Sequence, residues 1–328
     1  MSGVADLRHL TLLDGVQAFW RSAGLVQSDL EWVKQVGLSD SYRMGDPFVS
    51  VVWLMVVVSS LCFVLGLVMR NYSHVDRIWS IIPLVYCWHF LYHAWLNTGL
   101  LNERLVVMTA LVTVWGVRLS YNFARKGGYS LTEEDYRWPE LRKIITNRFL
   151  FEIFNLTFIS FYQNALLLMI TLPMYYSYLS VGVEWSWFDT LATGSFLFFL
   201  VLETVSDQQQ WNYQTTKHGM IKDKKPLFGK YKVGFNHTGL FRYSRHPNFL
   251  GEMSIWWSFY LFSLSHTPLS LINQSVIGTI LLTLLFQGST NFTEGITARK
   301  YPEYNVYKKG TSCFFPLPSS YRPPYKNE

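Results

Sequence analysis

The residue types that can carry chemistry gather in one stretch, Gly239–Glu252, which reads GLFRYSRHPNFLGE. Arg242 and Arg245 supply fixed positive charge, and His246 can change its protonation near neutral pH. Such groups suit the attraction of an anionic cofactor and the transfer of a proton. The proline that follows His246 fixes the backbone where the chain leaves a loop.

The elements around this stretch must place its polar groups at the edge of a membrane. A helix that starts at the proline puts Asn248 and Glu252 on one face. The next 41 residues, 253–293, contain no Asp, Glu, Lys or Arg, and a polar Ser-His-Thr-Pro turn lies in their middle. A membrane helix needs about 20 apolar residues. The run therefore predicts a helical hairpin that returns Glu294 to the side where Glu252 lies.

Two further carboxylates, Glu203 and Asp207, lie four residues apart near the end of another apolar run. Burial of both on one face requires donors nearby, and Lys217 and the two arginines are available. One interpretation is a polar pocket for ribose or amide groups, with Gln208 beside it. The other is an ion-pair lattice that ties two helices together.

The composition predicts an all-α, polytopic membrane protein. The chain is 50% hydrophobic and 15% charged, against about a quarter charged in soluble proteins. Its basic residues cluster between the apolar runs, which explains the net charge of +6 better than nucleic-acid binding does. Seven spans are expected, at residues 48–69, 78–101, 105–123, 153–183 and 190–210 and in the two arms of the hairpin, and Pro173 is expected to break the fourth of them.

Lys and Arg are concentrated in the loop between spans three and four and in the loop between spans five and six. This distribution predicts that these two loops and the C-terminus face the cytosol. Residues 1–47 form a separate N-terminal segment, in which apolar residues at helical spacing predict an amphipathic helix on the membrane. A docked structural helix fits that pattern equally well.

Other polar residues near the spans have two interpretations each. Arg118 can extend its long aliphatic side chain so that the guanidinium reaches the cytosolic interface, or it can bind a phosphate. Asp76 can cap a helix or act as an acid. His89 and His93 lie four residues apart, but a metal site needs three or four ligands, so packed histidines are favoured. The scattered cysteines add no metal spacing, and no metal is expected.

Several of these motifs together resemble the steroid 5-alpha-reductase superfamily, in particular its steroid-reductase-like membrane proteins. They are GLFRYSRHPNFLGE, ETVSDQQ, EGITARKYPEYNVY, VDRIW, WGVRLS and EDYRW. The resemblance covers about residues 70–318, with its motif core at 200–318. Residues 48–328 are therefore expected to form one steroid-reductase-like transmembrane domain.

The resemblance implies an endoplasmic-reticulum enzyme that binds NADPH from the cytosol and reduces a carbon–carbon double bond of a steroid, sterol or other lipid drawn from the bilayer. Together, the matched motifs and the residue patterns above predict one cofactor-binding set: Arg118, Glu203, Asp207, Gln208, Arg242, Tyr243, Arg245, His246, Asn248, Glu252, Glu294 and Tyr304. The glutamate and tyrosine that hold the substrate carbonyl in steroid 5-alpha-reductases have no aligned counterpart. Asp76, Tyr92 and His246 are the candidate catalytic proton donors.

A second family has nearly the same central motif. Isoprenylcysteine carboxyl methyltransferases, which use S-adenosylmethionine, also contain R-H-P-x-Y-x-G followed by an acidic pair. Here Glu294 follows a threonine instead of forming that pair, and the long N-terminal half with its EDYRW loop also favours the reductase. A lipid-binding membrane protein without enzymatic activity is the third interpretation.

Overall fold

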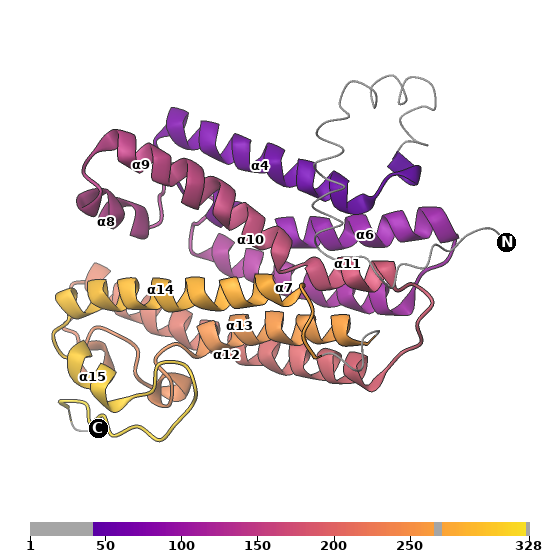
Figure 1. Cartoon of the computed structure of the whole chain (residues 1–328). Coiled ribbons are helices and arrows are strands. Elements are labelled where there is room, and N and C mark those ends of the chain that lie inside the picture. Colours follow the sequence, from indigo (N-terminus) through magenta and orange to yellow (C-terminus); the bar gives the residue numbers. More distant parts are fainter. Residues whose placement is uncertain (1–41, 266–270, 326–328) are drawn as a thin grey trace. The chain divides into compact units, whose positions relative to one another are not determined.

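The computed structural model describes residues 42–265 and 271–325, and within them every regular element is a helix (Figure 1). The predicted amphipathic helix in residues 1–47 lies almost entirely outside the described residues. The longer helices are α4 (Pro47–Met69), α6 (Ile82–Thr98), α7 (Glu103–Arg125), α12 (Trp187–Lys222), α13 (Pro247–Leu261) and α14 (Val276–Lys300). The shorter elements are α5 (His74–Ile78), α8 (Arg137–Ile144), α9 (Arg148–Phe154), η2 (Asn155–Tyr162), α10 (Gln163–Met169), α11 (Leu172–Leu179), η3 (Gly229–Tyr231), η4 (Gly239–Arg242), η5 (Phe262–Leu264) and α15 (Tyr304–Gly310).

Five of the described helical segments are long and apolar enough to cross a membrane: α4, α7, the continuous run Arg148–Leu179, α12 and α14. The prediction of a multi-pass, all-helical membrane protein is therefore confirmed. The other two predicted spans coincide with α6 and α13, which have only 17 and 15 residues. A total of seven spans, and the cytosolic position of the C-terminus, stay predictions.

Local signals explain where the first span begins and ends. The side chain of Asp46 accepts a hydrogen bond of 2.8 Å from the backbone nitrogen of Phe48, and Pro47 occupies the first turn of α4. A proline is tolerated there because its missing N–H would have no partner inside the helix. The helix ends where Arg70 takes a left-handed conformation with φ of 52°.

The fourth predicted span is a chain of shorter elements instead of one regular helix. Its middle, η2, is a π-helix, and the run breaks between Met169 and Leu172. Pro173 explains the break, because a proline cannot donate the hydrogen bond that an uninterrupted helix requires. The apolar run and its break at Pro173 were both predicted, whereas the π-helix was not.

The segment 131–142, which contains the EDYRW motif, is held by contacts with α5. Trp138 is 3% exposed and donates from Nε1 to an Asp76 oxygen at 2.9 Å. Arg137 binds the other oxygen of that carboxylate at 2.9 Å. Arg77 donates to the backbone oxygens of Ser130 and Glu133. Because these contacts bury its tryptophan, the segment is not simply solvated.

The chain divides into two compact units. Unit 1 comprises residues 1–193 and 259–281, and unit 2 comprises residues 194–258 and 282–328. One buried ion pair in unit 1 is well partnered: Arg104 and Asp189 lie 2.7 Å apart, and Asp189 also accepts a hydrogen bond from Ser265. Such pairing is needed where no water is available to hydrate a charge.

Unit 1 also contains a very close helix contact. A Cβ atom built on Gly278 of α14 would lie 2.2 Å from the backbone carbon of Met169, at the end of α10. Only glycine permits this approach, since backbone atoms cannot move aside as a flexible side chain can. The same helix has a second glycine, Gly288, with nothing within 4 Å of a built Cβ.

We expect Gly278→Ala to destabilise the protein by about 1–3 kcal/mol, because the added methyl group overpacks the contact with Met169. Gly288→Ala is the matched control on the same helix, and its better helix propensity should leave stability unchanged or slightly higher. Thermal unfolding of the two variants in detergent measures the difference. Equal midpoints would contradict the close packing of α14 against α10.

Candidate functional site: a buried carboxylate with four donors

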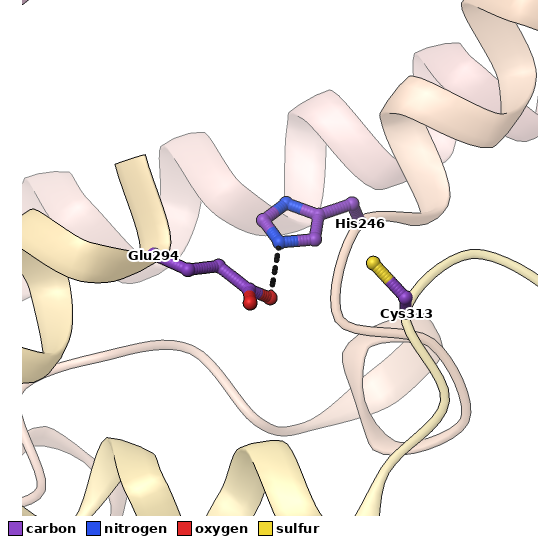
Figure 2. Close-up of side chains that lie close together, drawn as sticks. All are labelled: His246, Glu294 and Cys313. Carbon is purple, nitrogen blue, oxygen red and sulfur yellow. Dashed lines mark hydrogen bonds and ion pairs between the residues drawn. The ribbon is translucent and has the colours of Figure 1, made fainter. Parts of the chain in front are cut away.

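The carboxylate of Glu294, on α14 in unit 2, is 1% exposed and accepts hydrogen bonds from four side chains. Arg245 Nε lies 2.6 Å away, His246 Nε2 2.9 Å, Lys308 Nζ 2.9 Å and the Tyr304 hydroxyl 3.2 Å. We call these five residues the Glu294 cluster. Figure 2 shows the ring of His246 pointing at the carboxylate from the opposite chain segment.

Backbone contacts with the C-terminal segment position the arginine and the histidine. The amide of Arg245 donates to Ser312 O at 2.8 Å, and the amide of His246 donates to Cys313 O at 3.1 Å. Helix α13 begins at the next residue, Pro247, so His246 stands at its N-terminus. The histidine is thus fixed by two segments that are far apart in the sequence.

The guanidinium of Arg245 forms its hydrogen bonds with groups of the protein itself. Besides Glu294, its guanidinium donates to the backbone oxygens of Lys308 and Thr311. Burial alone would lower the pKa of Arg245, but the hydrogen bond and charge of Glu294 raise it above the usual value, so the group stays charged. Its geometry therefore suits positioning of the loop better than direct contact with a ligand.

His246 keeps one nitrogen available. Its ring stacks on Phe249, with centroids 5.2 Å apart, and Phe249 packs edge-on against Phe286 of α14. Nε2 is taken by Glu294, whereas Nδ1 has no hydrogen-bond partner among residues 42–265 and 271–325. This arrangement fixes the ring and leaves Nδ1 as the atom that can reach a ligand.

The predicted carboxylates and amide on α12 and α13 do come together. Asn248 Nδ2 donates to Asp207 Oδ1 at 3.3 Å. A Cβ built on Gly251 would lie 2.7 Å from the Cβ of Glu203, so the two helices nearly touch there. Glu203, Asp207 and Glu252 are all buried. The further expectation that Glu252 and Glu294 line one site stays a prediction.

The sequence interpretation missed Gln209, which stands beside the predicted Gln208. Gln208 is exposed and bonds to Asn212 on its own helix. Gln209 instead accepts a hydrogen bond of 2.8 Å from the backbone amide of Leu240 and fixes η4, which carries Arg242. A built Cβ on Gly239 would lie 2.4 Å from Gln209, which explains the glycine in the motif. No sequence signal distinguishes the two neighbouring glutamines.

The sequence interpretation also did not include Lys308, although its spacing from Tyr304 indicates a shared helix face. It lies four residues after Tyr304 on α15, so the two side chains share a helix face and reach the same carboxylate. Arg242 and Tyr243, both predicted, are exposed at the end of η4. They present a cation and a hydroxyl to solvent.

Three predicted residues, Asp76, Tyr92 and Arg118, belong to unit 1. Both oxygens of Asp76 are engaged by Arg137 and Trp138, the last two residues of the EDYRW motif, and burial raises the pKa of this carboxyl group. Tyr92 is 51% exposed on α6, and Arg118 is half-buried on α7. Nothing in these contacts assigns any of the three to the Glu294 cluster.

Histidines lie in two groups whose composition could suit a metal ion. Ligand atoms of His246, Glu294 and Cys313 all lie within 4.8 Å of one another (Figure 2). However, Arg245 and Lys308 already bind the two oxygens of Glu294, and a divalent cation there would face two fixed positive charges. The cluster is therefore better suited to an anion than to a metal.

The other pair, His89 and His93 on α6, has all four ring nitrogens within hydrogen-bond distance of protein groups. His89 contacts the hydroxyl of Tyr42 and the backbone oxygen of Pro47, each at 3.1 Å. His93 contacts the hydroxyl of Tyr178 at 2.9 Å and the backbone oxygen of Tyr42 at 3.1 Å. These contacts fit the favoured interpretation as packed histidines.

An aromatic group holds the C-terminal segment that supplies Lys308. Phe235 packs against Tyr304, Tyr307 and Tyr321. His237 is 5% exposed beside them, with its ring nitrogens near Phe235 O and the hydroxyl of Tyr325. Burial lowers the pKa of His237, because charging the ring there loses hydration.

We expect Glu294→Gln to lower the free energy of unfolding by about 3 kcal/mol, because it leaves a buried arginine and a lysine without their counter-charge. Asp223→Asn removes the same charge from an exposed ion pair with Lys225 and should cost less than about 1 kcal/mol. Thermal unfolding in detergent compares the two. Similar losses would mean that Glu294 is not the central counter-charge.

Acid should weaken the fold through His237. The unfolded histidine binds a proton below about pH 6.5, whereas the folded one resists it, so stability is present above that pH and is lost as the pH falls. The midpoint of thermal unfolding should therefore drop less on acidification in His237→Gln than in the unaltered chain. Parallel pH curves for the two proteins would exclude this linkage.

Comparisons with known proteins give a relative and a family for this chain. A protein of Schizosaccharomyces pombe described as uncharacterized is 38% identical over 293 residues, which cover 86% of this chain and 83% of that protein. No solved structure matches. The profile of a family described as "Protein of unknown function (DUF1295)" matches residues 62–311. The chain therefore belongs to the DUF1295 family.

Proposed function

We propose that the chain is a membrane oxidoreductase that uses NADPH to reduce a carbon–carbon double bond of a steroid, sterol or other lipid enone. The observation that carries the proposal is the Glu294 cluster. Its carboxylate and two cations sum to one net positive charge when His246 is neutral. Positive charge beside an available imidazole nitrogen suits a polyanionic cofactor.

The groups around the cluster fit such a cofactor. Arg242 is exposed and has no hydrogen-bond partner among the described residues, so it is available to a phosphate. Tyr243 and Asn248 lie on either side of the histidine in the sequence and offer hydroxyl and amide groups for ribose or carboxamide. Arg245 holds the loop that presents them. NADPH, when bound, supplies the hydride.

The protein must also supply a proton, because an enolate oxygen gains charge as a conjugated double bond is reduced. His246 Nδ1 is the best placed of the three candidate donors. Glu294 binds Nε2 and fixes the orientation of the ring. Asp76 has both oxygens occupied, and Tyr92 is exposed on its helix. We propose that the lipid substrate enters the site from the bilayer.

Charge also separates the reductase from the methyltransferase alternative. S-adenosylmethionine has a positive sulfonium centre, which the net positive Glu294 cluster would repel. The phosphates of NADPH would be attracted instead. The non-enzymatic, lipid-binding alternative requires neither cofactor, so a binding measurement distinguishes all three.

The test is a thermal-shift titration of the detergent-purified chain with NADPH and with S-adenosylmethionine. We expect NADPH alone to raise the midpoint of unfolding. His246→Gln, which keeps a hydrogen-bonding group near Glu294, and Asn248→Ala should abolish that shift. His218→Gln is the control, because His218 is an exposed histidine on α12.

Each other outcome has a definite meaning. A shift with S-adenosylmethionine alone would identify a membrane methyltransferase. A shift with neither compound, in protein that unfolds cooperatively, would support the lipid-binding alternative. An NADPH shift that survives both site variants would reject the assigned residues while keeping the cofactor.

A further inference from the structure

A second concentration of positive charge follows α12 and is not used by the proposed reaction. Residues 222–232, KDKKPLFGKYK, form what we call the lysine loop. Its five lysines are Lys222, Lys224, Lys225, Lys230 and Lys232. All except the half-buried Lys230 are exposed. Asp223 is the single acid, and it pairs with Lys225 at 3.0 Å.

The loop folds back along α12, which sets its depth relative to the membrane. The hydroxyl of Tyr213 donates to the backbone oxygen of Lys230 at 3.1 Å, and Lys217 Nζ donates to Gly234 O at 2.7 Å. Tyr213 lies six residues beyond Asp207, the last acid of the predicted span, or about 9 Å along the helix. Headgroup layers extend about 5–8 Å beyond the hydrocarbon. Lysine side chains on the loop can therefore reach them.

Apolar side chains accompany the lysines. Ile221 is 53% exposed and Phe228 is 61% exposed. Tyr231 packs beside Tyr213, with ring centroids 5.3 Å apart, and Phe228 meets Tyr231 edge-on at 6.4 Å. Exposed aromatic and aliphatic groups next to lysines are characteristic of segments at the membrane–water interface.

We propose that the lysine loop binds the headgroups of anionic phospholipids in the membrane that α12 crosses. The charge of the loop is complementary to these lipids, and its exposed apolar residues would enter the layer just beneath them. Unlike Arg245, which the protein itself saturates, the exposed lysines retain donors for phosphate and carboxylate groups. The loop would bind these lipids whether or not the chain is a reductase.

Native mass spectrometry of the full chain in detergent, titrated with dioctanoyl phosphatidylserine, tests the proposal. Dioctanoyl phosphatidylcholine is the neutral comparison and should bind far more weakly. The triple variant Lys224→Gln, Lys225→Gln, Lys232→Gln should weaken phosphatidylserine binding by roughly fivefold per lysine, or about a hundredfold in total. Added salt should weaken binding to the unaltered chain.

The matched control removes three exposed cations elsewhere: Lys143→Gln, Arg148→Gln, Lys309→Gln. It should retain binding if the loop is the site. Equal loss in both triple variants would mean a general charge effect and overturn the proposal. Displacement of the lipid by inorganic pyrophosphate at similar concentration would also overturn it, since the site would then bind soluble anions.

Discussion

The buried carboxylate of Glu294 is the constraint on which the C-terminal half depends. A charge that is 1% exposed is tolerated only when other groups replace its lost hydration. Its partners come from the loop before α13, which supplies Arg245 and His246, and from α15, which supplies Tyr304 and Lys308. Three segments that are distant in the sequence must therefore fold together around one side chain.

The same requirement shapes the proposed function. Because Arg245 and Lys308 over-compensate the carboxylate, the cluster keeps a positive charge that it can offer to an anion. Because Glu294 takes Nε2 of His246, the opposite nitrogen is presented in a fixed direction. The buried ion pair and the fixed orientation of His246 are thus two consequences of one arrangement.

Much of the fold could be predicted because a membrane imposes a simple rule on composition. Apolar runs located α4, α7, α12 and α14, since a spanning segment must be apolar over about 20 residues. Composition does not determine the local geometry of a helix, so the prediction contained less detail there. Composition predicted a span at residues 153–183 and its break at Pro173, but not its π-helix, which depends on how backbone hydrogen bonds are locally redistributed.

The sequence by itself predicted an all-helical membrane protein and included Arg245, His246, Glu294 and Tyr304 of the Glu294 cluster among its candidates. Helical spacing placed Asn248 at the face where it meets Asp207, because neighbours along one helix are set by local geometry. The tertiary structure decided which residues complete the site. Gln209 rather than its neighbour holds η4, and Lys308 joins Glu294, since contacts between distant segments depend on how loops return and not on any local period.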